Sequence, residues 1–129
     1  MAEAAQSYRQ AVEIRGELGE RNLAIESLAG LARASLGQKD LSLALTHVEE
    51  ILDHLEDKTL DGTDEPFRIY LTCYRVLRAN QDPRAQDVLA EAHRLLQERA
   101  ARISDEETRR LFLENVTAHR EIVEAWESR

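Results

Sequence analysis

The residues with the most obvious potential for chemistry are three side chains of one predicted helix. His47, Glu50 and His54 are spaced i, i+3 and i+7, which places two imidazoles and a carboxylate on one helical face. These groups suit Zn²⁺, but a structural zinc site has four ligands and the sequence shows no fourth ligand beside them. The alternative is a solvated face, on which Glu49, Glu50 and Asp53 keep the helix in water. We expect the solvated face, with no metal and no cofactor.

Two further residues have reactive side chains, and we expect both to be structural. Cys73 is the only cysteine, so an intramolecular disulfide is excluded. It lies beside Tyr74, Val76 and Leu77, a setting typical of a buried thiol. His119 lies on an apolar stripe, where a packed imidazole with a hydrogen-bond partner is expected rather than a catalytic one. The chain has no glycine-rich phosphate loop and no nucleophile–base motif. The sequence therefore predicts no active site, and we expect that the protein is not an enzyme.

The clearest functional signal is electrostatic. Residues 66–81 contain three arginines and no acidic residue, in a chain whose 17 basic and 25 acidic residues give a net charge of −8. Four side chains at i, i+3, i+7 and i+10 share one helical face: Arg68, Leu71, Arg75 and Arg78. The planar guanidinium suits carboxylates, so an acidic peptide or an acidic C-terminus is a reasonable ligand. Alternatively, these arginines pair with acids of neighbouring helices or cover apolar surface with their stems.

Composition and helix-breaking residues predict an all-α protein of six helices. Leu, Ala, Glu and Arg make up just over half of the 129 residues, whereas there are only two prolines and five glycines. Asp40 and Pro66 are expected to begin the third and fourth helices, and Ser104-x-x-Glu107 is a capping box for the last. The predicted helices span residues 2–17, 22–36, 41–57, 66–79, 83–101 and 104–128.

Two residue patterns alternate along the chain. The first is a small residue followed by two apolar positions, and it occurs as Ala4-x3-Tyr8-x2-Ala11, Ala44-x3-Val48-x2-Ile51 and Ala85-x3-Leu89-x2-Ala92. The second occurs as Leu28-x2-Leu31-Ala32-x2-Ser35, Tyr70-x2-Cys73-Tyr74-x2-Leu77 and Arg109-x2-Phe112-Leu113-x2-Val116. Because small residues let helices approach closely, each pattern marks one contact stripe. The alternation predicts helix pairs that repeat every 40 to 41 residues.

This arrangement resembles the tetratricopeptide repeat (TPR) family, whose helix A carries W-x2-L-G-x2-Y and whose helix B carries A-x3-F. The bulky aromatic residue and the closing proline are missing, and the period exceeds the usual 34 residues, as in longer-repeat members. The resemblance implies a single right-handed α-solenoid over 1–129. Its parts are helix B of a truncated repeat (1–19), two repeats (22–57 and 65–101) and a C-terminal capping helix (104–128).

The resemblance also implies a function. In this family helix A residues line a concave surface, so the arginine face of residues 68–78 would line a groove, with Arg33 at the position equivalent to Arg75. We therefore expect a non-catalytic protein–protein interaction scaffold that binds a peptide or a partner domain. Ile103–Val116 and His119-Arg120-Glu121-Ile122 are similar to the end of repeat regions in large bacterial multidomain regulators. The chain is thus expected to be a fragment of a larger bacterial protein, or alternatively a ligand-sensing or relay segment of a bacterial transcriptional or signalling regulator.

Charge and hydropathy limit the expected partners and location. A net charge of −8 disfavours nucleic acid, because binding to it depends on neutralising phosphates. No apolar run approaches about 18 residues, so no membrane span is expected. With a lone cysteine and no secretion signal, we expect a cytoplasmic protein. The helix at 1–19 has no helix A before it, and its exposed face is expected to drive self-association.

Overall fold

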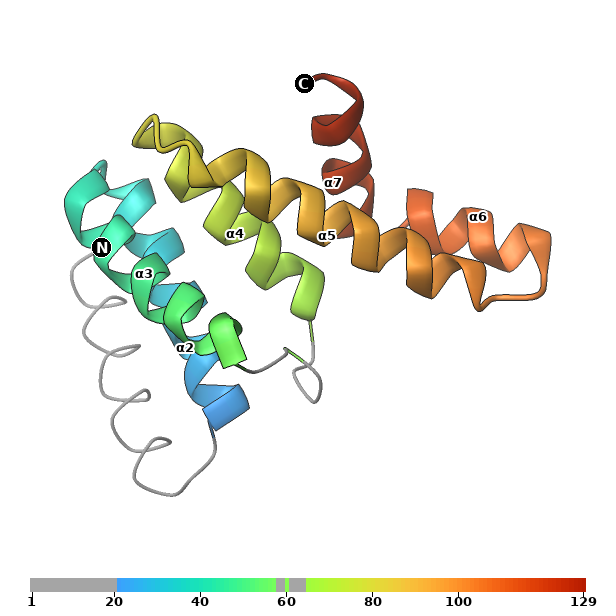
Figure 1. Ribbon diagram of the computed structural model, residues 1–129, viewed down its shortest axis with the longest axis horizontal. Helices are drawn as coiled ribbons and strands as arrows, with labels where there is room; N and C mark the ends of the chain where they lie inside the picture. Colours follow the sequence, from blue (N-terminus) through green and yellow to red (C-terminus); the bar gives the residue numbers. More distant parts are fainter. Residues whose placement is uncertain (1–20, 58–59, 61–64) are drawn as a thin grey trace.

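The structure, a computed structural model, describes residues 21–57, 60 and 65–129 (Figure 1). Within these residues there are six α-helices and no β-strand, which confirms the all-α prediction for the described part. The predicted helix over 2–17, and the self-association expected of it, lie outside the described residues. The helices are α2 (Arg21–Gly37), α3 (Leu41–Asp57), α4 (Pro66–Ala79), α5 (Arg84–Ala101), α6 (Glu106–Glu114) and α7 (Thr117–Glu127).

The first four of these helices form two hairpins with the same turn. Lys39 and Gln81, which are 42 positions apart, both have a positive φ, of 63° and 56°. In each turn the next backbone N–H donates back to the preceding helix: Asp40 N to Ser35 O and Asp82 N to Leu77 O, both at 2.9 Å. The two hairpins therefore repeat not only in sequence but also in their backbone hydrogen bonds.

Residues close in the sequence explain where α3, α4 and α5 begin. The Asp40 carboxylate accepts from Leu43 N–H at 3.1 Å, as the sequence predicts for an N-cap residue. Pro66 occupies the first turn of α4, where the missing N–H costs nothing. Asp82 accepts from Arg84 N–H at 2.9 Å, and its hydrogen bonds with Arg84 lower the pKa of its carboxyl to about 2.

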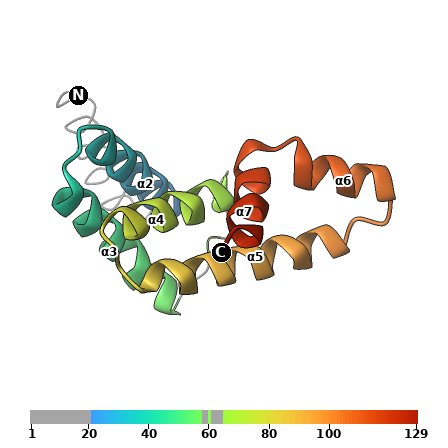
Figure 2. The same ribbon diagram turned by 90° about the horizontal axis from the view of Figure 1, so that it is seen from above.

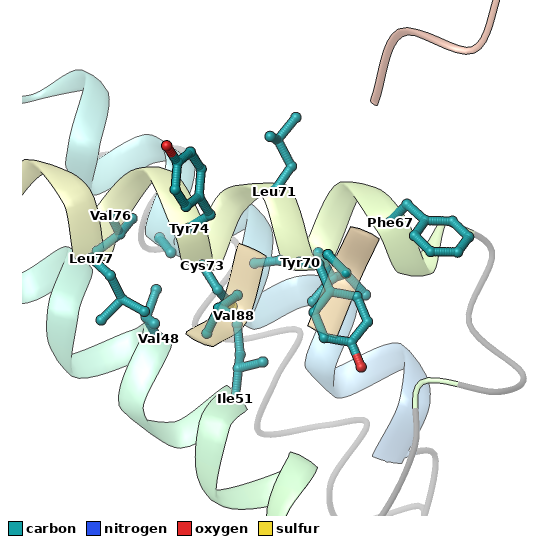
Figure 3. Packing of buried hydrophobic residues seen from close by; sticks show 14 of the residues in the cluster. Val48, Ile51, Phe67, Tyr70, Leu71, Cys73, Tyr74, Val76, Leu77 and Val88 are labelled. Carbon is teal, nitrogen blue, oxygen red and sulfur yellow. The ribbon is translucent and has the colours of Figure 1, made fainter. Parts of the chain in front are cut away.

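α4 is the central helix of the described structure. It contacts α2, α3, α5 and α7, and nine of its 14 residues are buried. Figure 3 shows that Cys73 and Leu77 point to one side of α4, toward Val48 and Ile51 of α3, whereas Leu71 points to the other side. The small-and-apolar stripes predicted on α3 and α5 are buried, as expected of helix contacts: Ala44, Val48, Ile51, Ala85, Leu89 and Ala92.

The C-terminal segment differs from the prediction of one helix over 104–128. It is divided into α6 and α7, because Val116 is extended (φ −85°, ψ 116°) and interrupts the helix. The residue that caps α6 is Asp105, whose carboxylate accepts from Thr108 N–H at 2.9 Å, so the capping box assigned to Ser104 and Glu107 is wrong. A carboxylate one position further on provides the same bond, and sequence spacing alone does not choose between them.

α7, rather than α6, packs against both helices of the second hairpin. It contacts α4 and α5, as α4 contacts α2 and α3. Figure 2 shows α7 beside these helices and α6 displaced along α5. The pattern assigned to Arg109–Val116 is therefore wrong: α6 has no buried residue and Val116 is 43% exposed. The same spacing recurs ten positions later as His119-x2-Ile122-Val123-x2-Trp126, in which Ile122 is fully buried.

Candidate functional site

The five residues predicted to bind a peptide line two cavities that share Leu71, Arg75 and Glu121. Arg33 on α2 and three of the predicted α4 residues, Arg68, Leu71 and Arg75, line an open cavity of about 450 Å³ together with the start of α7. A second cavity, of about 680 Å³, lies between α4, α5 and α7. We call these the α2–α4–α7 cavity and the α4–α7 cavity. We call the residues around them the arginine surface: Arg33, Arg68, Leu71, Arg75 and Arg78.

Two arginines of this surface form ion pairs. The Arg68 guanidinium lies 3.2 Å from Glu65 within the first turn of α4, and the two side chains are 51% and 64% exposed. The Arg75 guanidinium lies 2.8 Å from Glu121 of α7, a residue that sequence reasoning missed. The alternative of pairing with acids of neighbouring helices is thus confirmed for Arg75. A guanidinium has five N–H donors, however, and a contact through one nitrogen uses only part of that capacity.

The remaining arginines of the surface hydrogen-bond to hydroxyl groups. Arg33 donates to Thr72 Oγ1 at 2.9 Å, and Thr72 in turn donates to the backbone carbonyl of Arg68 at 2.8 Å. Arg78 donates to the phenolic oxygen of Tyr74 at 3.4 Å. These bonds hold the α2 arginine against α4, so guanidinium groups from two helices line one cavity.

The three residues considered as metal ligands do not form a site. His47 is buried, whereas Glu50 is exposed. In the part of the chain that the structure describes, no group of three or more His, Cys, Asp or Glu side chains could hold a metal ion. The solvated face expected for His47 is wrong, because His47 shares the i, i+3, i+4 and i+7 stripe of Ala44, Val48 and Ile51 that packs inward.

His119 anchors the first turn of α7, as the prediction of a packed histidine requires. Its Nδ1 lies 2.8 Å from the carbonyl oxygen of Phe112, which confirms a hydrogen bond with a neighbour. Its ring also contacts Phe67 edge to face, with centroids 4.9 Å apart. Burial lowers the pKa of the imidazole. The hydrogen bond with Phe112 only partly offsets this, and the positive charge of Arg99 adds a smaller lowering.

We expect the stability of the chain to depend on His119 below neutral pH. The pKa of His119 is lower in the folded chain than its unfolded value of 6.5, so folding favours the neutral imidazole. Its contribution to the free energy of unfolding is therefore complete above pH 6.5 and is lost as the pH falls below that value. Urea unfolding at pH 7.5 and pH 5.5 should show a larger loss for the wild type than for His119→Phe, which does not titrate. His93, whose pKa burial also lowers, is present in both proteins and cancels in the comparison. An equal loss in both would contradict this role.

A third cavity, of about 500 Å³, was not predicted. It lies between α3, α4 and α5, and its apolar lining includes Leu52, Leu55 and Phe67. Some of the charged residues at its edge pair with one another: Glu98 lies 3.1 Å from Arg94 and 3.3 Å from Arg102. We call it the α3–α5 cavity. The signal in the sequence was the pair Leu52 and Leu55, which lie next to the buried stripe of α3 but outside it.

Comparisons with known proteins add no relationship to this description. The chain matches no protein-family model, and searches of curated proteins and of solved structures find no significant match. The described residues define an all-α protein of two helix hairpins with a further helix packed against the second one. Among the described helices, none has both the length and the apolar character needed to cross a membrane.

Proposed function

We propose that the chain is a non-catalytic protein-interaction module of the TPR kind. It binds an acidic peptide, or an acidic segment of a partner protein, on the surface that α2, α4 and α7 form together. The repeated hairpin turn and the packing of α7 support a solenoid of this kind. In such a solenoid α2, α4 and α7 are the inner helices, which give a rigid platform on which side chains of different repeats lie side by side.

The observation that carries the proposal is the convergence of arginines on one cavity. Arg33, Arg68 and Arg75 line the α2–α4–α7 cavity together with Glu65 and Glu121, so arginines outnumber acids there although the whole chain carries a net charge of −8. Its volume of about 450 Å³ accommodates several side chains of a ligand. Arginines at a rigid concave site bind carboxylates through paired N–H donors, which gives both attraction and orientation.

A charge-reversal variant tests the proposal. We expect Arg68→Glu, Arg75→Glu to weaken binding of a hexaglutamate peptide about tenfold or more, because two attractive contacts become repulsive. The measurement is the fluorescence anisotropy of a peptide with a tetramethylrhodamine label and an amidated C-terminus. The matched control is Arg110→Glu, Arg120→Glu, which makes the same change in net charge at residues that are 61% and 52% exposed outside these cavities. Equal binding by the two double variants would refute the proposal.

The alternative function, a ligand-sensing or relay segment of a bacterial regulator, has one observation in its favour. The α3–α5 cavity has a partly apolar lining and, at about 500 Å³, the size of small-molecule sites. A screen of apolar small molecules that raises the melting temperature of the wild type, with no binding of acidic peptides, would favour this function over the first.

A further inference from the structure

One ion pair joins the arginine surface to α7. Arg75 and Glu121 both line the α2–α4–α7 cavity and the α4–α7 cavity, so their contact of 2.8 Å lies where the two cavities meet. A ligand that extends from one cavity into the other has to pass this contact. Glu121 therefore lies in the path of any peptide that uses the whole arginine surface.

The position of Glu121 is fixed by its neighbour in the sequence. Ile122 is fully buried and holds α7 against α4 and α5. The Glu121 side chain is 32% exposed and the Arg75 side chain 50% exposed, so a carboxylate is held beside a guanidinium that still reaches solvent. By contrast, Arg68 and Glu65 are neighbours on the open end of α4 and are both more than half exposed. Exposed pairs of this kind contribute little, and a ligand displaces them easily.

We propose that Glu121 is an intramolecular competitor that sets how many carboxylates a ligand needs. This inference rests on the proposed function of the same surface. On Arg75, Glu121 takes the position of a ligand carboxylate, so a ligand with a single carboxylate replaces one ion pair with an equivalent one. A ligand gains more when it also engages a further arginine such as Arg68, whose exposed pair with Glu65 is easily displaced. Two turns of helix separate Arg68 from Arg75, about 10 Å along α4, which an extended peptide spans in about three residues.

The test compares two peptides on proteins with and without the competing carboxylate. The peptides are hexaglutamate and one glutamate followed by five glutamines, both labelled with tetramethylrhodamine and amidated. We expect Glu121→Gln to bind hexaglutamate about two- to fivefold more tightly than the wild type, the gain from losing one exposed competing pair. We also expect it to bind the single-glutamate peptide more tightly than the wild type does, because a single carboxylate on Arg75 then adds an ion pair and replaces none.

The control is Glu107→Gln, which removes the same charge from a residue of α6 that is 74% exposed and 3.8 Å from Arg110. Trp126 of α7 is the only tryptophan and stacks on His93, so its emission reports whether α7 stays in place. A gain shared by Glu107→Gln would overturn the inference, as would a gain accompanied by a shift of Trp126 emission toward that of the unfolded chain. If wild-type binding depends on Arg68 and Arg75 but not on Glu121, the inference fails and the proposed function stands. If neither protein binds hexaglutamate, both fail.

Discussion

Leu77→Ala is expected to lower the free energy of unfolding by about 2 to 5 kcal/mol, the range for truncating a fully buried leucine. Leu77 is 0% exposed and lies on the side of α4 that packs toward α3, beside Val48 (Figure 3). The substitution leaves its backbone carbonyl in place, so the hydrogen bond from Asp82 N–H in the turn remains. The loss therefore measures side-chain packing at the contact between the two hairpins. Urea unfolding followed by circular dichroism gives the value.

The control for this variant is Leu111→Ala on α6. Leu111 is 42% exposed and α6 has no buried residue, so the same truncation should change the free energy of unfolding by less than about 0.5 kcal/mol. Similar losses in the two variants would mean that α4 is not the centre of the packing described above.

The parts of the fold that sequence predicts well are those set by local chemistry. Asp40 begins α3 because its carboxylate reaches a backbone N–H three residues away, and Pro66 begins α4 because of its own fixed φ. Neither needs information about distant residues. The buried stripes of α3 and α5 are also predicted, because the period of a helix decides which positions share a face.

The C-terminal segment could not be predicted in the same way, because two registers of its sequence fit the repeat equally well. Arg109–Val116 and His119–Trp126 have the same spacing of apolar residues. What distinguishes them is that Ile122 can be buried against both α4 and α5, whereas the residues of α6 extend beyond the second hairpin. That choice depends on the length of α5 and on the turn at Val116. Both are properties of the folded chain.

The sequence predicted the arginines of the candidate site but not the carboxylate that faces them. The arginine face follows from the period of a single helix, so Arg68, Leu71, Arg75 and Arg78 could be grouped from sequence. The residue that faces Arg75 comes from α7, and an acidic chain has too many carboxylates for Glu121 to be recognised in advance. The helical period also places His47 on the buried stripe of Val48. The acidic residues beside it in the sequence led instead to the wrong prediction that its side chain is solvated.

Cys73 is expected to react with a thiol reagent at least about a thousandfold more slowly in the folded chain than in the unfolded one, because few chains of a domain of ordinary stability are open at any moment. Burial raises the pKa of its thiol from 9.0 to about 12, so at pH 8 the thiolate, which is the reacting species, is about a thousandfold scarcer. Its side chain is also 0% exposed, which excludes the reagent itself. Absorbance of the product released from a disulfide reagent, recorded with and without denaturing urea, gives the two rates. A fast reaction in the folded chain would contradict the burial.

The destabilisation by Leu77→Ala and the slow labelling of Cys73 are linked, and measuring them together is a sharper test than either measurement alone. Because the folded thiol is both inaccessible and protonated, the residual reaction proceeds through chains that have transiently opened, and its rate follows the opening equilibrium. Leu77 lies one turn of α4 beyond Cys73 and packs on the same side (Figure 3). Leu77→Ala should therefore accelerate labelling of Cys73 by the factor that corresponds to its loss of stability, about 30-fold for 2 kcal/mol. Leu111→Ala should leave the rate nearly unchanged. Acceleration by Leu111→Ala would contradict this, because it would show that the movement of α6 and α7 exposes the thiol.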